Sequence, residues 1–211
     1  MNLVWGFILI PVIAICLIPF LKMGGKAIAV YAAVSLIAIL TSFVAIEALL
    51  GKTFNCTLPG SFISGPIRLQ VDALSAWFML IINFGFLTGG FYGLFYMSAY
   101  KNQPKNLTLA AILFVLLYTA LVSLCAIQNS FVFIVVWEIM ALSAFLSILF
   151  EHEKVATIKA GINFLIQSHV SIIFLIIGFI WVASQTGSYD FGAIHAYSLS
   201  HPGMLSMQLY L

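Results

Sequence analysis

The sequence predicts an all-α membrane protein, a polytopic bundle of six complete transmembrane helices and the start of a seventh. Of its 211 residues, 64% are apolar and only 7% are charged, whereas soluble domains average about 45–50% apolar and about 25% charged residues. Six apolar segments are each close to or above the ~20 residues that a helix needs to cross a bilayer. The first of them lacks the basic region and cleavage site of a signal peptide, so we interpret it as a retained span.

The predicted spans follow one another with short connections. Only Gln128-Asn129-Ser130 separates the fourth from the fifth, so these two must be antiparallel. A further apolar run starts near Met204 and stops at Leu211, and we interpret that end as a truncation. The chain is then one membrane domain, with a three-helix leader over about 1–97 and the first part of a repeat over about 108–211. The six spans are about Leu3–Leu21, Ala27–Leu50, Asp72–Met97, Leu109–Ile127, Phe131–Phe150 and Ile158–Ala183.

Prolines and glycines predict where helices bend, end or pack closely. Pro11 and Pro19 are expected to kink or end the first span. In the third span Gly85 and Gly89 are four residues apart and are followed by Gly90 and Gly93. Small residues at this spacing let a neighbouring backbone approach closely, so we expect a tight helix contact there.

The distribution of basic residues predicts the orientation. The loops on one side carry six basic residues and those on the other side carry only Lys52 and Arg68. Because basic loops remain in the cytoplasm, the N-terminus is expected outside, in the cell inner (plasma) membrane. The segments Gly51–Val71 and Ser184–Gly203 are then external. A net charge of +2 gives no reason to expect nucleic acid as a partner. The six basic residues of the loops expected in the cytoplasm are Lys22, Lys26, Lys101, Lys105, Lys154 and Lys159.

Glu138 is the candidate for function. It lies among twenty otherwise uncharged residues from Phe131 to Phe150. An acid near the centre of a membrane helix costs about 2.5–3.5 kcal/mol on insertion scales, so such residues usually serve ions or protons. Apolar neighbours disfavour the charged carboxylate and a nearby cation favours it, so a carboxyl balanced between the two can load and release a proton. The alternative is an acid that only hydrogen-bonds a neighbouring helix.

The sixth span carries a second polar set. At 100° per residue, Lys159, Asn163, Gln167 and Ser171 form one stripe, which either lines a channel or holds helices together. His169 points ~120° away from Asn163. It is either a relay group, since imidazole gains and loses a proton near neutral pH, or a neutral core histidine. Lys159 either reaches the headgroups or pairs with Glu138.

The remaining polar residues predict structure rather than catalysis. Asp72 precedes the third span and is expected to cap that helix, with a role in conduction as the alternative. Cys16 and Cys125 lie in apolar runs, and no metal-binding motif is present. The sequence therefore predicts no catalytic residue, no metal and no cofactor in this chain.

Three segments resemble the antiporter-like family of membrane subunits. They are QVDALSAWFMLIINF, NSFVFIVVWEIMALSAFLSILFEHEK and KAGINFLIQSHVSIIFLIIGFIWVASQTGSYDF, which together span roughly Val71 to Phe191. The family includes the large membrane subunits of respiratory complex I, those of group 4 hydrogenases such as hydrogenase-4 component B and formate hydrogenlyase, and Mrp-type sodium/proton antiporters. Ser168-His169 is closer to the Thr-His pattern of the hydrogenase branch than to the Asn-Arg pattern of complex I.

The resemblance implies a function. Glu138 matches the family's essential glutamate, which pairs with a lysine of the seventh span, and no residue up to Leu211 matches that lysine. Glu138 is therefore expected to be neutral here and to contact neighbouring helices, and the 211 residues alone are not expected to conduct. The implied protein is a proton-translocating subunit of a redox complex (hydrogenase or NADH-quinone oxidoreductase type), whose other subunits carry the electrons. An Mrp-type antiporter subunit and a truncated, non-conducting scaffold are the alternatives.

Overall fold

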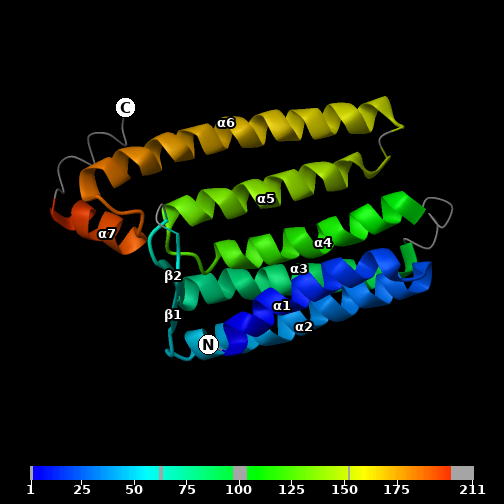
Figure 1. Cartoon of the computed structure of the whole chain (residues 1–211), viewed down its shortest axis with the longest axis horizontal. Coiled ribbons are helices and arrows are strands. Elements are labelled where there is room, and N and C mark those ends of the chain that lie inside the picture. The colour runs from blue at the N-terminus through cyan, green and yellow to red at the C-terminus, as the bar shows by residue number, and fades with distance from the viewer. Residues whose placement is uncertain (1, 62–63, 97–103, 152, 201–211) are drawn as a thin grey trace.

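Six long helices run side by side in the computed structural model, which describes residues 2–61, 64–96, 104–151 and 153–200 (Figure 1). All six are long and apolar enough to cross a membrane, so the prediction of an all-α membrane bundle is confirmed. The apolar run from Met204 to Leu211, predicted to start a seventh span, lies outside the described residues, as does Lys101. The helices are α1 (Asn2–Leu17), α2 (Met23–Leu49), α3 (Ala73–Tyr96), α4 (Pro104–Leu124), α5 (Ser130–Ile148) and α6 (Val155–Thr186).

The ends of two helices follow from residues with restricted or permissive backbones. Helix α1 continues through Pro11 and gives way to the 3-10 turn η1 (Ile18–Phe20), which contains Pro19. Helix α6 extends three residues beyond its predicted span at each end. It stops at Gly187, which has a φ of +66°, a left-handed conformation that glycine adopts without a steric cost.

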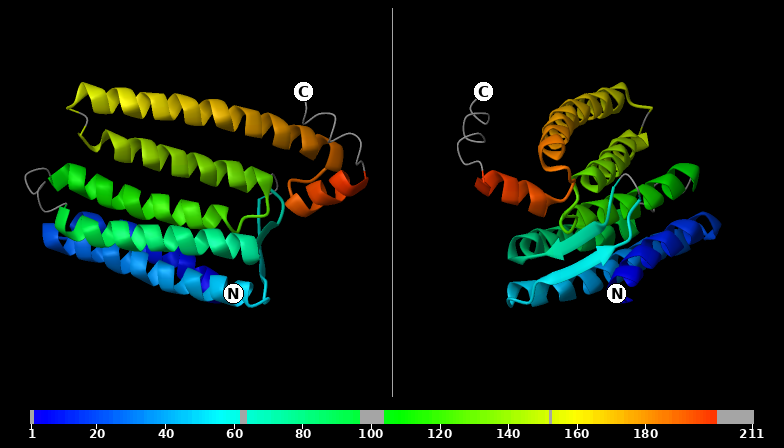
Figure 2. Two further views of the ribbon diagram at one scale, coloured as in Figure 1. Left: turned by 180° about the vertical axis from the view of Figure 1, so that it is seen from behind. Right: turned by 60° about the vertical axis from the view of Figure 1, so that its left-hand side comes forward.

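Two segments that the sequence analysis left as external connections contain regular structure. Residues 51–71 include the antiparallel strands β1 (Phe54–Leu58) and β2 (Ile67–Val71). The hairpin lies across one end of the helices, which we call the hairpin end (Figure 2). The segment after α6 contains the ten-residue helix α7 (Phe191–Ser200) near the same end.

The connections alternate between the two ends of the bundle. The hairpin, the α4–α5 turn and the α6–α7 turn are at the hairpin end, and the η1–α2 and α5–α6 connections are at the other (Figure 1). The second end carries Lys22, Lys26, Lys154 and Lys159, and we call it the lysine end. This alternation is what six consecutive spans require.

The core joins the leader helices to α4. Buried side chains of α2 and α4, such as Ile37 and Tyr118, pack in one cluster with Met79 of α3. Inside the cluster Asn83 accepts a hydrogen bond from the Tyr118 hydroxyl (2.7 Å) and donates one to Thr41 (2.9 Å). Polar side chains that satisfy one another in this way hold membrane helices together. Helices α5 and α6 extend this core to one side (Figure 2).

The glycines of α3 do not all have close neighbours. A Cβ built at Gly90 would lie 3.3 Å from the ring of Tyr31, so there the expected close contact exists. At Gly85 and Gly93 a Cβ would have nothing within 4 Å. The expected close approach is therefore seen at Gly90, whereas at Gly85 and Gly93 the described residues leave the space beside the glycine unfilled.

Candidate functional site

The carboxylate of Glu138, in the middle of α5, meets an imidazole of α6. Glu138 Oε1 is 3.0 Å from His169 Nε2, a hydrogen-bond distance. The other ring nitrogen, Nδ1, is 2.9 Å from the backbone oxygen of Leu165, one turn earlier in α6. The ring of His169 therefore bridges its own backbone and the carboxylate of the adjacent helix.

The partner of Nδ1 determines which proton of the ring can move. A carbonyl oxygen only accepts hydrogen bonds, so Nδ1 must carry a hydrogen in both the neutral and the charged ring. Nε2 is then the exchangeable position. It accepts from a protonated Glu138 when the ring is neutral, and it donates to the carboxylate when the ring is charged. One proton can thus lie on either residue with the same arrangement of heavy atoms.

The chain does not enclose this pair completely. The side chains of Glu138 and His169 are 34% and 44% exposed, so one side of the pair is open to whatever adjoins α5 and α6. Among the described residues, no ion pair links Glu138 to a lysine. Lys159 is exposed and lies ten residues, ~15 Å of helix rise, from His169 towards the lysine end.

The polar stripe of α6 lies on a different face from His169. Asn163, Gln167 and Ser171 are all exposed, and Ser171 donates to the backbone oxygen of Gln167 (2.9 Å). His169 instead turns towards α5. The structure therefore brings together only Glu138 and His169 among the predicted site residues.

A glycine allows α6 to approach the end of α5. A Cβ built at Gly161 would lie 2.9 Å from Leu149 Cδ2 and 3.4 Å from the ring of Phe145. The first distance is shorter than real Cβ contacts, so with a larger residue at 161 either the flexible end of the Leu149 side chain shifts or the two helices move apart. Gly161 is two turns of α6 before His169 and thus helps to set the distance between His169 and Glu138.

Aromatic rings close the space between α5 and α6 on the hairpin side of the pair. Phe133 of α5 packs edge to face against Phe179 of α6 and Phe191 of α7, with ring centroids 6.1 Å apart in both contacts. Trp137 adjoins Phe133, and its buried Nε1 has no hydrogen-bond partner among the described residues. Such apolar packing leaves little room for water between the pair and the hairpin end.

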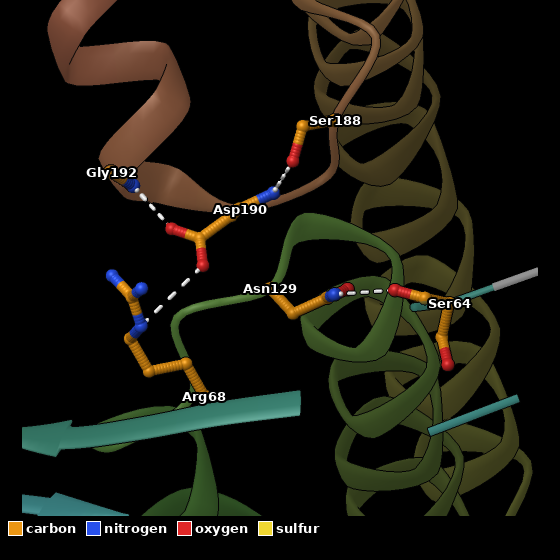
Figure 3. A network of polar contacts seen from close by, with 6 residues as sticks. All are labelled: Ser64, Arg68, Asn129, Ser188, Asp190 and Gly192. Atoms are coloured by element: carbon orange, nitrogen blue, oxygen red, sulfur yellow. Dashed lines mark hydrogen bonds and ion pairs between the residues drawn. The ribbon is translucent and has the colours of Figure 1, made fainter. Parts of the chain in front are cut away.

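A polar network fixes the hairpin ends of α5 and α6 (Figure 3). The buried Asn129, which caps α5 through Val132 N (3.1 Å), donates from Nδ2 to the backbone oxygen of Ser64 (2.8 Å). Arg68 Nε of β2 is 3.6 Å from Asp190 Oδ2, while Asp190 Oδ1 accepts from the N–H of Gly192 (2.7 Å) at the start of α7.

Backbone hydrogen bonds complete the network. Gln128 donates to the oxygen of Arg68 (2.9 Å), and Phe191 donates to the oxygen of Gln128 (3.0 Å). Ser130 donates from both its N–H and its hydroxyl to the oxygen of Tyr189. The hairpin, the α4–α5 turn and the α6–α7 turn are therefore linked directly, which fixes α5 relative to α6.

The pairing of Arg68 with Asp190 was not predicted from the sequence, in which Arg68 counted only as a loop charge and Asp190 had no assigned role. The available signal was local, because an Asp shortly before an apolar segment is typical of a helix start. The alternation in Phe54–Leu58 likewise indicated a strand.

Asp72 lies at the start of α3. Its Oδ1 accepts from the backbone N–H of Ser75 (2.8 Å), the geometry of a helix cap. This hydrogen bond lowers the pKa of Asp72 from its ordinary value. Asp72 immediately precedes α3, whereas the Glu138–His169 pair is formed by α5 and α6.

Comparisons with known proteins agree with the resemblance inferred from the motifs. Residues 127–211 match the family described as NADH:quinone oxidoreductase/Mrp antiporter, TM. The chain is also 28% identical over 156 residues to hydrogenase-4 component B of Escherichia coli (strain K12). That match covers 74% of this chain and 23% of the relative. The similarity to antiporter-like membrane subunits, and to their hydrogenase branch, is therefore confirmed.

Proposed function

We propose that this chain is part of a proton-translocating membrane subunit of a hydrogenase-type redox complex, and that Glu138 and His169 pass a proton between α5 and α6. The observation that supports this most directly is the 3.0 Å contact between Glu138 Oε1 and His169 Nε2 in the middle of two membrane spans. Ionisable side chains at that depth are a default sign of a proton or ion pathway.

The proposed proton step follows the contact between Glu138 and His169. A proton on Glu138 transfers to His169 Nε2, which leaves a carboxylate next to an imidazolium. The other ring hydrogen stays on Nδ1, which donates it to the Leu165 carbonyl oxygen throughout. The pair as a whole remains neutral during this step, so the transfer does not create an isolated charge in the bilayer, which would be costly.

Translocation further requires that the pair gain or lose one proton. Either change leaves a net charge on the pair, and its free energy then depends on charges nearby and on the membrane potential, worth ~2.3 kcal/mol per elementary charge per 100 mV. We infer that other parts of the complex supply those charges when electrons move.

The two sides of the Glu138–His169 pair differ in how closely they are packed. The aromatic rings of Phe133, Phe179 and Phe191 pack on the hairpin side. The open side of Glu138 and His169 is where we propose that protons enter and leave. The stripe of Asn163, Gln167 and Ser171 faces another direction, and we propose that it contacts a further helix of the protein or complex. We propose that Lys159, ten residues from His169 towards the lysine end, takes no part in the step at Glu138.

The proposed setting is a complex with several subunits. The E. coli relative is named as a component of a hydrogenase, so other membrane and peripheral subunits are the partners that we propose. The electron carriers and the redox chemistry belong to those subunits. In this chain we propose electrostatics and proton transfer, with no cofactor of its own. We further propose that the lysine end faces the cytoplasm and the N-terminus the outside.

The experiment uses the complete complex in membrane vesicles and measures proton uptake or release during hydrogen or formate oxidation. Glu138→Gln keeps the shape of the side chain but cannot ionise, so we expect translocation to be abolished or severely reduced while the complex still assembles. Glu47→Gln, the same change at an α2 carboxylate paired with Lys52, is the control and should translocate normally. Normal proton stoichiometry in Glu138→Gln would refute the proposal.

A sodium/proton antiporter of the Mrp type is the second candidate, because the matched family's description names both kinds of protein. The site favours protons, since Glu138 is paired with an imidazole, whereas hard cations such as Na⁺ prefer oxygen ligands. The two candidates differ in one measurement. Ion movement that depends on sodium and proceeds without any electron donor would support the antiporter.

A further inference from the structure

We propose that the lysine end holds a bound anionic phospholipid, in a cavity between α2, α3 and α4 whose mouth carries Lys26. This site is separate from the Glu138–His169 pair. The cavity has a volume of about 660 Å³, within the ~300–1,000 Å³ of typical ligand sites. Its lining includes Lys26 and Val30 of α2, Gly93 of α3, and Ala111 and Phe114 of α4.

The lining has the chemistry of a lipid site. Almost all of it is apolar, and it extends along three membrane spans from their ends at the lysine end. The absence of side chains at Gly89 and Gly93 leaves the space between α3 and its neighbours open, and a Cβ at Gly93 would meet nothing within 4 Å. In a bilayer such a space is filled by whatever lies beside it, which is an acyl chain unless another helix covers it.

The charge at the mouth determines which lipid fits. Lys26 donates one hydrogen bond to the Thr108 hydroxyl, which fixes its ammonium at the cavity, and an ammonium has three donors. Lys22 is exposed one turn earlier. Basic pockets between membrane helices bind the headgroups of anionic lipids. A negatively charged phosphate headgroup at Lys26, with an acyl chain along Gly93, therefore matches both the charge and the shape of the cavity.

Aromatic residues at the same depth support this placement. Tyr92 and Tyr96 stack with ring centroids 5.3 Å apart and are 64% and 46% exposed. Tyrosines are enriched at the boundary between headgroups and acyl chains. The mouth of the cavity is thus at the level where a phospholipid changes from polar to apolar.

The test is lipid retention by the full chain purified in mild detergent, followed by native mass spectrometry after exchange with phosphatidylglycerol or phosphatidylcholine. We expect the wild type to retain phosphatidylglycerol in preference to phosphatidylcholine. Lys26→Gln should weaken phosphatidylglycerol binding about fivefold, the loss expected for one basic residue near an anionic headgroup. Lys154→Gln, a lysine at the same end that does not line the cavity, should have no effect.

A second pair of variants tests the acyl-chain part of the site. Gly93→Leu adds a side chain to the lining at a position where a Cβ meets nothing within 4 Å, and it should reduce retention of both lipids. Gly85→Leu is the matched control, because Gly85 is on the same helix, is equally unhindered and does not line the cavity. Equal retention of the two lipids by the wild type, or unchanged retention in both Lys26→Gln and Gly93→Leu, would overturn the proposal. Displacement of the lipid by inorganic phosphate alone would also overturn it, since the site would then recognise only an anion.

Discussion

Arg68 and Asp190 connect the hairpin to the start of α7, with Arg68 Nε 3.6 Å from Asp190 Oδ2. Asp190 has two roles, because its other oxygen accepts from the N–H of Gly192. The two roles differ in strength. The ion pair is partly exposed, and exposed pairs contribute ~0–1 kcal/mol, whereas a helix cap contributes ~0.5–2 kcal/mol.

The first prediction follows from this difference. Asp190→Ala removes both interactions and should lower the free energy of unfolding by ~1–2 kcal/mol, while Arg68→Ala removes only the ion pair and should lower it by less than ~1 kcal/mol. Thermal unfolding in detergent compares the two variants. Equal losses would mean that the ion pair, and not the cap, is the main contribution of Asp190.

The second prediction concerns Asn129. It is buried, it caps α5, and it donates to Ser64 O across the network of Figure 3. Asn129→Ala leaves buried polar groups without partners, so we expect a loss of ~2–3 kcal/mol of stability. Asn55→Ala is the control, because Asn55 is exposed and makes only a 3.4 Å hydrogen bond. A loss no greater than that of Asn55→Ala would contradict this account.

The third prediction tests the coupling of Glu138 and His169. In the complete complex His169→Gln should reduce proton translocation as severely as Glu138→Gln, and the double variant should be no worse than either single one, because residues that act as a unit are not additive. His195→Gln is the matched histidine control, on the exposed side of α7. If the two single losses multiplied in the double variant, the residues would act independently.

The fourth prediction concerns Gly161, which allows α6 to approach α5. Gly161→Ala places a methyl group against Leu149, so we expect the helices to separate, the Glu138–His169 distance to increase and translocation to fall. Replacing Leu149 by Ala in the same chain removes the atoms at 2.9 and 3.4 Å and should restore part of the activity. The remaining contact with Phe145 limits that recovery. No recovery in the double variant would show that the contact with Leu149 is not the cause.

The fifth prediction is a pH dependence at Asp72. Its pKa is lowered, chiefly by the hydrogen bond from Ser75 N–H, so the charged form is favoured in the folded state. The resulting stabilisation is fully present above the ordinary pKa of 3.8 and disappears as the pH falls through the lower, folded-state pKa. Asp72→Asn still caps the helix but does not titrate. The stability difference between wild type and Asp72→Asn should therefore shrink as the pH is lowered from 6 to 3, and a constant difference would contradict the prediction.

The spans could be predicted because a bilayer requires every backbone polar group to be satisfied within the segment, so apolar length alone identifies the helices. Glu138 was identified for the same reason, as a charge where charges are costly. The partner of Glu138 was not identified. Helical periodicity separates His169 from the stripe of Asn163 on the surface of α6, but it cannot give the rotation of α6 about its axis relative to α5.

The missed elements have physical explanations too. The strands β1 and β2 are only five residues each and have glycines and prolines nearby. These residues favour turns, so the segment was interpreted as a loop despite its alternating polar and apolar residues. The glycines of α3 predicted that the backbone of another helix packs against them. The sequence shows that such packing is sterically possible, but it does not show which element occupies the space. At Gly85 and Gly93 no described residue lies within 4 Å of an added Cβ.

The unequal lengths of α5 and α6 make the Glu138–His169 contact dependent on the bilayer. Helix α5 has 19 residues and spans ~28 Å, close to the ~30 Å hydrocarbon thickness, whereas α6 has 32 residues and spans ~48 Å. A helix longer than the bilayer accommodates the excess by tilting, while α5 needs no tilt. We therefore expect a thinner membrane to increase the crossing angle of the two helices and to shift the imidazole along the carboxylate, so that the proton transfer proposed above would depend on lipid chain length.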